Sequence, residues 1–296
     1  MSLLVRRRIR RRVSFASPGL SLEERRRVLD RNGSLVSLPR GTMLERVVVS
    51  GVPCEWILPY RHDPGRVVLF LHGGAYTLGS CNSHRGMVAH VARACRARAL
   101  LPEYRLAPEH PFPAALEDAV AVYRFLLGSG VPPGHVTLMG DSAGGGLALA
   151  TLLALRDAGD PLTAAAVCIS PWTDLAATGE TLRTRARHDV VLRPETVGRS
   201  AALYHGGHPP DHPLVSPLYA DLAGLPPLLV QVGGHEILLS DATRLAERAR
   251  NAGVEVTLRV WPGMWHVWHG YVDWVPESRR AIREIAEFAD RHRTAA

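Results

Sequence analysis

Lysine is absent from this 296-residue chain, so its positive charge rests on arginine. We attribute this absence to coding bias rather than to function. Long apolar runs are also lacking: no stretch approaches the about 18 apolar residues of a membrane-spanning helix, and Leu3 to Val5 are too few for a signal peptide. Cysteine is scarce and shows no paired spacing, which excludes a disulfide framework and indicates the reduced thiols of a cytoplasmic protein. The four cysteines are Cys54, Cys81, Cys95 and Cys168.

The excess of positive charge lies almost entirely at the N-terminus. Six of the 35 basic residues are the arginines at positions 6, 7, 8, 10, 11 and 12, which leaves 29 basic against 28 acidic residues elsewhere and reduces the net charge from +7 to +1. The body of the chain is therefore almost neutral, and we expect no nucleic-acid partner. Arg6 to Val13 could form a basic helix on an acidic surface or on lipid headgroups, but a solvated terminus is the favoured interpretation.

A metal site is not expected. His205, His208 and His212 are spaced like metal ligands, but the glycines and prolines among them are incompatible with a helix that would bring the three side chains together. No cysteine or carboxylate cluster completes a tetrahedral site. We interpret these histidines as structural or solvated.

The patterning indicates one α/β domain over residues 1–296. With 46% hydrophobic residues and no internal repeat, the chain can bury a substantial core, and apolar strand patterns alternate with helical ones. We therefore expect a mostly parallel central sheet flanked by helices. The predicted strands lie near 44–49, 54–60, 66–71, 98–102, 135–139, 164–169, 228–232 and 254–261. The predicted helices lie near 84–96, 114–127, 143–158, 241–252 and 277–292.

The sequence G-D-S-A-G-G at residues 140–145 lies between a predicted strand and a predicted helix. A G-x-S-x-G turn in this context is a nucleophile elbow, because small residues on both sides tolerate strained backbone angles and expose the serine hydroxyl. Ser142 is therefore the candidate nucleophile.

A glycine turn, H-G-G-A at residues 72–75, follows the predicted strand 66–71. Serine attack on a carbonyl forms an oxyanion, which backbone N–H groups in such a turn can stabilise. Gly73 and Gly74, together with Ala143 directly after the nucleophile, are the predicted donors. We interpret His72 as a brace for this loop rather than as a base.

A general base is expected on a turn after the last strand, from which it can reach the nucleophile across the sheet. His266 follows the predicted strand 254–261 and is favoured, with His269 as its nearest rival. The carboxylate that orients the base is expected after the preceding strand. Glu236 fits that position best, and Asp241, interpreted as the N-cap of the next helix, is the second candidate.

Four segments together resemble the bacterial hormone-sensitive-lipase family of esterases, which have the α/β-hydrolase fold. They are H-G-G-A at 72–75, E-Y-R-L-A-P-E-H-P-F-P-A-A-L-E-D at 103–118, G-D-S-A-G-G at 140–145 and W-P-G-M-W-H-V-W at 261–268. The likeness runs from about residue 60 to the C-terminus. It implies a serine carboxylesterase that acts on a small-molecule ester through an acyl-enzyme, without a metal or an organic cofactor.

The chain departs from the family pattern at the acid. Aligning Glu236 with the first aspartate of the family's D-P-L-x-D-E segment also matches Leu238, but it places glutamate where aspartate is usual. Ala75 replaces a third glycine and keeps its N–H, and Glu103 replaces an aspartate. Members of the family often pair through their last strand, so a homodimer is one assembly that the resemblance raises.

Two segments fall outside the strand and helix alternation and are expected to form a cap, about 1–42 and 175–213. The first contains a capping box that begins at Ser21, and the second is rich in Arg, His and Pro. Because the second segment lacks large apolar residues, it predicts a pocket for modest, short- to medium-chain esters. Tyr76 and Trp172 are the predicted lining residues.

Two alternatives remain open from the sequence. The same Ser, acid and His groups serve amide or carbamate hydrolysis. A hydrolase scaffold can also become a non-catalytic small-molecule binder by losing its histidine, although this chain retains His266.

Overall fold

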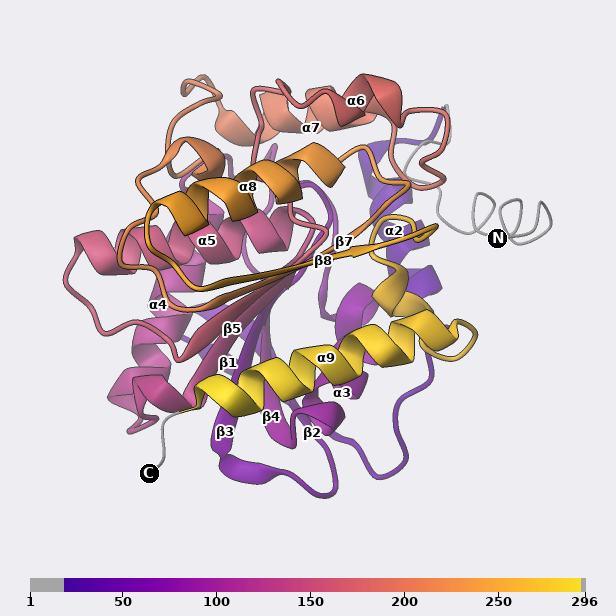
Figure 1. Cartoon of the computed structure of the whole chain (residues 1–296). Coiled ribbons are helices and arrows are strands. Elements are labelled where there is room, and N and C mark those ends of the chain that lie inside the picture. Colours follow the sequence, from indigo (N-terminus) through magenta and orange to yellow (C-terminus); the bar gives the residue numbers. More distant parts are fainter. Residues whose placement is uncertain (1–18, 294–296) are drawn as a thin grey trace.

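The computed structural model describes residues 19–293, and it contains a single eight-stranded sheet in that range (Figure 1). The strand order is β1-β2-β4-β3-β5-β6-β7-β8, in which the first two pairings are antiparallel and the others parallel. The strands are β1 (Met43–Val49), β2 (Val52–Leu58), β3 (Asp63–Leu71), β4 (Ala97–Pro102), β5 (Val136–Asp141), β6 (Ala165–Ile169), β7 (Leu228–Gly233) and β8 (Val256–Trp261). The predicted mostly parallel sheet is confirmed.

Helices cover both faces of this sheet (Figure 1). Helices α4 (Ala114–Gly128), α5 (Ala143–Asp157) and α8 (Leu239–Asn251) lie on one face, and α3 (Cys81–Ala94) and α9 (Pro276–His292) lie on the other. Two separate buried apolar clusters form, one on each face. The central strands β5, β6 and β7 are buried along their whole length, which explains their mainly apolar sequences.

The N-terminal part of the predicted cap contributes α2 (Leu22–Gly33). The predicted capping box is confirmed, since the Ser21 hydroxyl accepts from the Glu24 N–H and the Glu24 carboxylate accepts from the Ser21 N–H. Arg26 attaches this helix to the body of the domain: its guanidinium donates to the Thr77 carbonyl at 2.9 Å and to Glu109 at 2.7–2.8 Å. Residues 1–18, with the segment Arg6 to Val13, lie outside the described residues.

The second cap segment contains α6 (Thr181–Thr184) and α7 (Pro194–His205). Helix α7 begins at Pro194 and ends before Gly206, which adopts a left-handed conformation with φ 56°. The described part of the chain also contains three short 3-10 helices: η2 (Pro133–His135), η3 (Pro217–Tyr219) and η4 (Trp268–Tyr271). The division of the chain into body and cap stays a prediction.

The four cysteines are buried free thiols, in agreement with the predicted lack of a disulfide framework. Between residues 19 and 293, no helix is long and apolar enough to cross a membrane.

Candidate active site

The turn between β5 and α5 presents Ser142 with φ 54° and ψ −122°, angles that a residue with a side chain rarely adopts. The glycines at 140 and 144 make this tight turn possible, because other backbone atoms of the protein lie very close to them. A Cβ atom at Gly140 would collide with the Gly144 carbonyl, and one at Gly144 would collide with the Leu71 carbonyl. The local sequence thus forms the tight strand-turn-helix predicted for a nucleophile elbow.

The structure brings Ser142, His266 and Glu236 together from three segments that follow β5, β8 and β7. His266 Nε2 lies 2.9 Å from Ser142 Oγ, and His266 Nδ1 lies 2.8 Å from Glu236 Oε2. All three side chains are buried, so bulk water does not compete for these hydrogen bonds. Because the carboxyl ends of parallel strands meet at one edge of a sheet, residues far apart in the sequence converge here.

The surroundings of His266 shift its pKa in two directions. Burial lowers the pKa of His266, but the hydrogen bond to Glu236 and the charges of Glu236, Asp189 and Asp141 raise it above its usual value. Such an imidazole can hold a proton taken from the serine hydroxyl. Glu236 is itself fixed, because its Oε1 accepts hydrogen bonds from Ser170 Oγ and from the Gly233 N–H, both at 2.6 Å.

The rival residues of the sequence analysis do not contact the Ser142 hydroxyl. His269 Nε2 lies 2.8 Å from Gln231 Oε1, and burial lowers the pKa of His269 to about 3. His72 Nδ1 lies 2.8 Å from the Gly73 carbonyl, and its ring stacks on Tyr104 at 4.1 Å, contacts that brace the loop.

Asp241 is not the N-cap of α8, which is a correction to the sequence interpretation. The helix begins at Leu239, and the Asp241 carboxylate accepts from the N–H groups of Thr173 and Asp174, both at 2.9 Å. It therefore anchors the segment after β6 instead of capping its own helix. Burial, together with the charge of Asp174, raises the pKa of Asp241 to about 7. Its Oδ1 has no hydrogen-bond partner among the described residues.

We expect Asp241→Asn to remain active and to become relatively more stable as the pH rises. The wild-type carboxyl titrates near 3.8 in the unfolded chain and near 7 in the fold, so its contribution to stability falls across this window as the pH rises. The amide can still accept from both N–H groups and does not titrate. Melting temperatures at about pH 5 and about pH 8 measure this, and a constant difference between variant and wild type would contradict it.

The structure changes the expected set of oxyanion donors. The Gly73 N–H donates to Asp141 Oδ1 at 2.9 Å, so it is committed to holding the loop. Among the described residues, no acceptor takes the N–H of Gly74, Ala75 or Ala143, and the first two line the cavity beside Ser142. Ala75 therefore replaces Gly73 as a candidate donor. Sequence reasoning missed this because the decisive partner, Asp141, is 68 residues away in the chain.

The cavity beside Ser142 has a volume of about 130 Å³ and is not lined by Tyr76 or Trp172. Both aromatic residues are buried in the core, where Tyr76 stacks on Tyr204 of α7 at 3.5 Å. Their predicted place in the pocket is therefore wrong: Tyr76 packs against α7, and Trp172 packs against Tyr76. Val191 and Leu192 from the cap form one wall of the cavity. Both lie within the predicted cap segment, but no pattern in the sequence singled them out.

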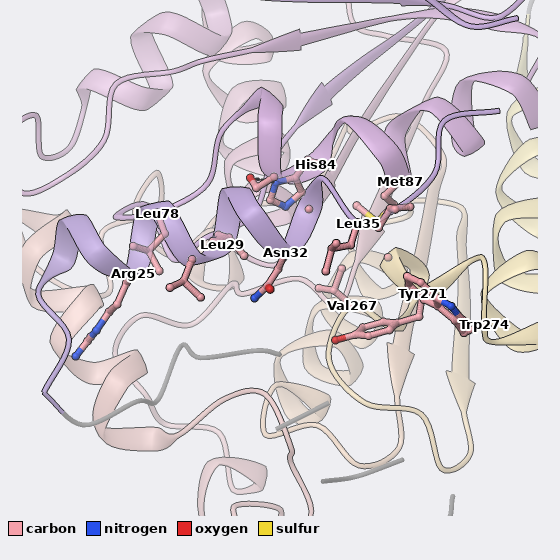
Figure 2. A pocket seen from close by; sticks show the side chains of 15 residues that line it. Arg25, Leu29, Asn32, Leu35, Leu78, His84, Met87, Val267, Tyr271 and Trp274 are labelled. Atoms are coloured by element: carbon pink, nitrogen blue, oxygen red, sulfur yellow. Dashed lines mark hydrogen bonds between the residues drawn. The ribbon is translucent and has the colours of Figure 1, made fainter. Parts of the chain in front are cut away.

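A second cavity of about 140 Å³ adjoins the first, and the two share the lining residues Leu29, His84, Val267 and Tyr271. Figure 2 shows this groove, with Leu29 and Asn32 on α2, and Tyr271 and Trp274 near the C-terminal segment. Its lining is mainly apolar. A group bound at Ser142 can therefore extend along α2.

Within residues 19–293, no group of three or more His, Cys, Asp or Glu side chains is arranged to hold a metal ion. His208 and His212 instead pack against Phe112, with ring centroids 5.0 and 5.4 Å from the phenyl ring.

Comparisons with known proteins agree with this architecture. A family model described as the alpha/beta hydrolase fold matches residues 68–270. An acetyl-hydrolase of Streptomyces hygroscopicus is 53% identical over 242 residues, which cover 82% of this chain and 81% of that protein. An esterase from the bacterial hormone-sensitive lipase family has a TM-score of 0.95 at 49% identity, covering 98% of this chain and 97% of that chain. The esterase EstE5, in crystals soaked with p-nitrophenyl butyrate, has a TM-score of 0.93 at 42% identity over 99% of this chain and 98% of that chain.

Fold, sequence match and structural neighbours define the class as the carboxylic ester hydrolases with the α/β-hydrolase fold. Within that class, the chain belongs to the bacterial hormone-sensitive-lipase family. The predicted family and enzyme class are confirmed, and the alternative of a non-catalytic binding protein is not retained.

Proposed function

We propose that this enzyme is a serine carboxylesterase that hydrolyses short- to medium-chain esters through a covalent acyl-enzyme. The observation that carries the proposal is the continuous hydrogen-bonded chain from Ser142 through His266 to Glu236. A serine hydroxyl is a weak nucleophile unless an adjacent base accepts its proton, and the base must itself be oriented by a third group.

In the first half of the reaction, Ser142 Oγ attacks the ester carbonyl carbon as its proton passes to His266 Nε2. The carbonyl oxygen becomes an oxyanion that the N–H groups of Gly74, Ala75 and Ala143 stabilise. His266 then gives its proton to the leaving alkoxide, and the alcohol departs as the acyl-enzyme forms. Glu236 stabilises the imidazolium and holds its tautomer.

In the second half, water replaces the alcohol. His266 removes a proton from the water as the water oxygen attacks the acyl carbon, and a second oxyanion forms in the same place. Its collapse breaks the bond to Ser142 Oγ, which takes the proton back from His266. The carboxylic acid leaves, and the free enzyme is restored. The serine nucleophile, the general base and the general acid are all side chains of this protein.

The size of the site supports modest esters. Each cavity is smaller than the roughly 300–1,000 Å³ of pockets for drug-sized ligands. The wall of Val191 and Leu192 is buried and packed, so an acyl chain on that side of Ser142 could lengthen only by displacing it, and the remaining room lies along α2. A cytoplasmic location, a homodimer and the lack of a nucleic-acid partner stay predictions.

We expect activity across p-nitrophenyl esters from acetate to palmitate to be highest at short to medium acyl lengths. Initial rates at matched substrate concentrations measure the profile. A maximum at long chains, together with activation at an oil interface, would overturn the proposed substrate class.

A fluorophosphonate probe tests the nucleophile directly, because it forms a covalent bond only with an activated serine. Wild-type enzyme should be labelled, and peptide mapping should place the label at Ser142. Labelling at another serine, or no labelling of active enzyme, would contradict the proposed mechanism.

A further inference from the structure

Asp189 lies in the cap, in the segment between α6 and α7, and is fully buried with 0% exposure. Its Oδ1 accepts from the N–H groups of Val191 and Leu192 at 2.8 and 2.9 Å, and its Oδ2 accepts from the Ile237 N–H at 3.0 Å. Among the described residues it forms no ion pair, so the three backbone donors are what compensate its burial.

The two oxygens of this carboxylate hold two different parts of the site. Val191 and Leu192 form the cap wall beside Ser142, whereas Ile237 directly follows Glu236. The cap also holds the carbonyl of Ile237, which accepts from Thr181 Oγ1 at 2.7 Å. Both backbone polar groups of Ile237 are therefore bound by cap side chains. Asp189 thus contacts both the segment that carries Glu236 and the wall of the pocket.

Asp189 binds the residue after Glu236, and Glu236 is the partner of His266, so the charge of Asp189 lies near the base. The groups that raise the pKa of His266 are Glu236 after β7, Asp189 in the cap and Asp141 at the end of β5, whereas burial lowers it. His269 is the neighbouring imidazole, and burial keeps it neutral. The cap thus supplies negative charge to a site that becomes positively charged during the reaction.

We propose that Asp189 is a positioning residue that couples the cap to the catalytic centre, setting the acyl-chain limit through Val191 and Leu192 and supporting the imidazolium of His266. The inference rests on the proposed triad. It predicts that the cap is part of the catalytic arrangement rather than a cover added to a complete site.

Asp189→Asn tests both effects with almost no change in shape. In the variant, the amide oxygen can still accept from the N–H groups of Val191 and Leu192. The NH₂ group of the amide then faces the N–H group of Ile237, and these two donors repel each other. We expect kcat/KM for p-nitrophenyl butyrate to fall about 10–100-fold, because misplacement of about 1 Å can cost 10²-fold. The ratio of octanoate to butyrate hydrolysis should rise as the wall loosens.

The pH profile separates an electrostatic role from a merely structural one. Loss of a negative charge near His266 destabilises the imidazolium, so the acid limb of the kcat/KM profile should move to lower pH in Asp189→Asn. Thr181→Val loosens the other hold on Ile237 without changing charge, and it should lower kcat/KM while leaving the acid limb in place. Asp211→Asn, the same chemical change at an exposed cap position, should match wild type in both measurements.

The outcomes distinguish this inference from the proposed function. Wild-type enzyme that fails to hydrolyse esters and to react with a fluorophosphonate would overturn the proposed function. Wild-type enzyme that does both, combined with an Asp189→Asn variant whose chain-length ratio and acid limb are unchanged, would overturn the role of Asp189 alone. Melting temperatures of the three variants show whether each is folded at the assay temperature.

Discussion

Ser142→Ala is expected to abolish hydrolysis of p-nitrophenyl butyrate, with a loss on the order of 10⁶ in kcat. Without the hydroxyl, no acyl-enzyme forms, and His266 has no nucleophile to activate. The oxyanion donors and the substrate cavity remain, so a small residual rate above that in water is expected. Steady-state kinetics at saturating substrate measure the effect.

Ser129→Ala is a suitable control, because Ser129 is an exposed serine at the end of α4 and remote from the elbow. It should retain wild-type kinetics and remain labelled by the fluorophosphonate, whereas Ser142→Ala should lose both activity and label. A folded Ser142→Ala variant that keeps a tenth of the wild-type activity would refute the assignment of the nucleophile.

The strands and helices were predictable because each one shows an apolar pattern in its own local sequence. Buried strands such as β5 and β7 have mainly apolar sequences, and a turn follows each of them. The elbow and the histidine turn were recognisable for the same reason. Each of these local sequences contains the end of a strand and a reactive side chain. The topology of the sheet then brings Ser142 and His266 together.

The corrected residues depend on contacts that no local pattern contains. Gly73 and Gly74 are adjacent glycines that the sequence does not distinguish. The Gly73 N–H is engaged only because the carboxylate of Asp141, distant in the sequence, accepts its hydrogen bond. Tyr76 follows the oxyanion loop yet turns into the core, because α7 supplies Tyr204 as a stacking partner. Asp241 has the sequence position of a cap, but the segment after β6 offers two N–H groups in the folded chain.

The wall of the pocket was missed for a related reason. Val191 and Leu192 belong to an irregular cap segment whose apolar residues have no period, so nothing in the sequence indicates which of them face the nucleophile. Their N–H groups are bound by Asp189. Nothing in the sequence distinguishes this buried acid from an aspartate on the surface. A pocket wall supplied by an irregular segment is therefore less predictable than the reactive groups that follow the strands.

Glu236→Gln is expected to lower kcat by roughly 10⁴ while the protein stays folded. The Glu236 carboxylate accepts a hydrogen bond from the Nδ1–H group of His266, which leaves Nε2 free to take the proton of Ser142. If the amide presents its NH₂ group to Nδ1, the imidazole adopts the opposite tautomer, and a proton on Nε2 faces the serine. The amide oxygen can still accept from Ser170 and the Gly233 N–H, so we expect a melting temperature close to that of wild type.

Asp241→Asn provides the matched comparison, because it makes the same chemical change in a buried acid on the same segment. Asp241→Asn should keep wild-type kcat, and Asp241→Ala should remain active but less stable, since the N–H groups of Thr173 and Asp174 would lose their acceptor. Kinetics and melting curves of the three variants decide the assignment. An active Glu236→Gln beside an inactive, folded Asp241→Asn would make Asp241 the triad acid, and it would show that aligning Glu236 with the family's first aspartate is wrong.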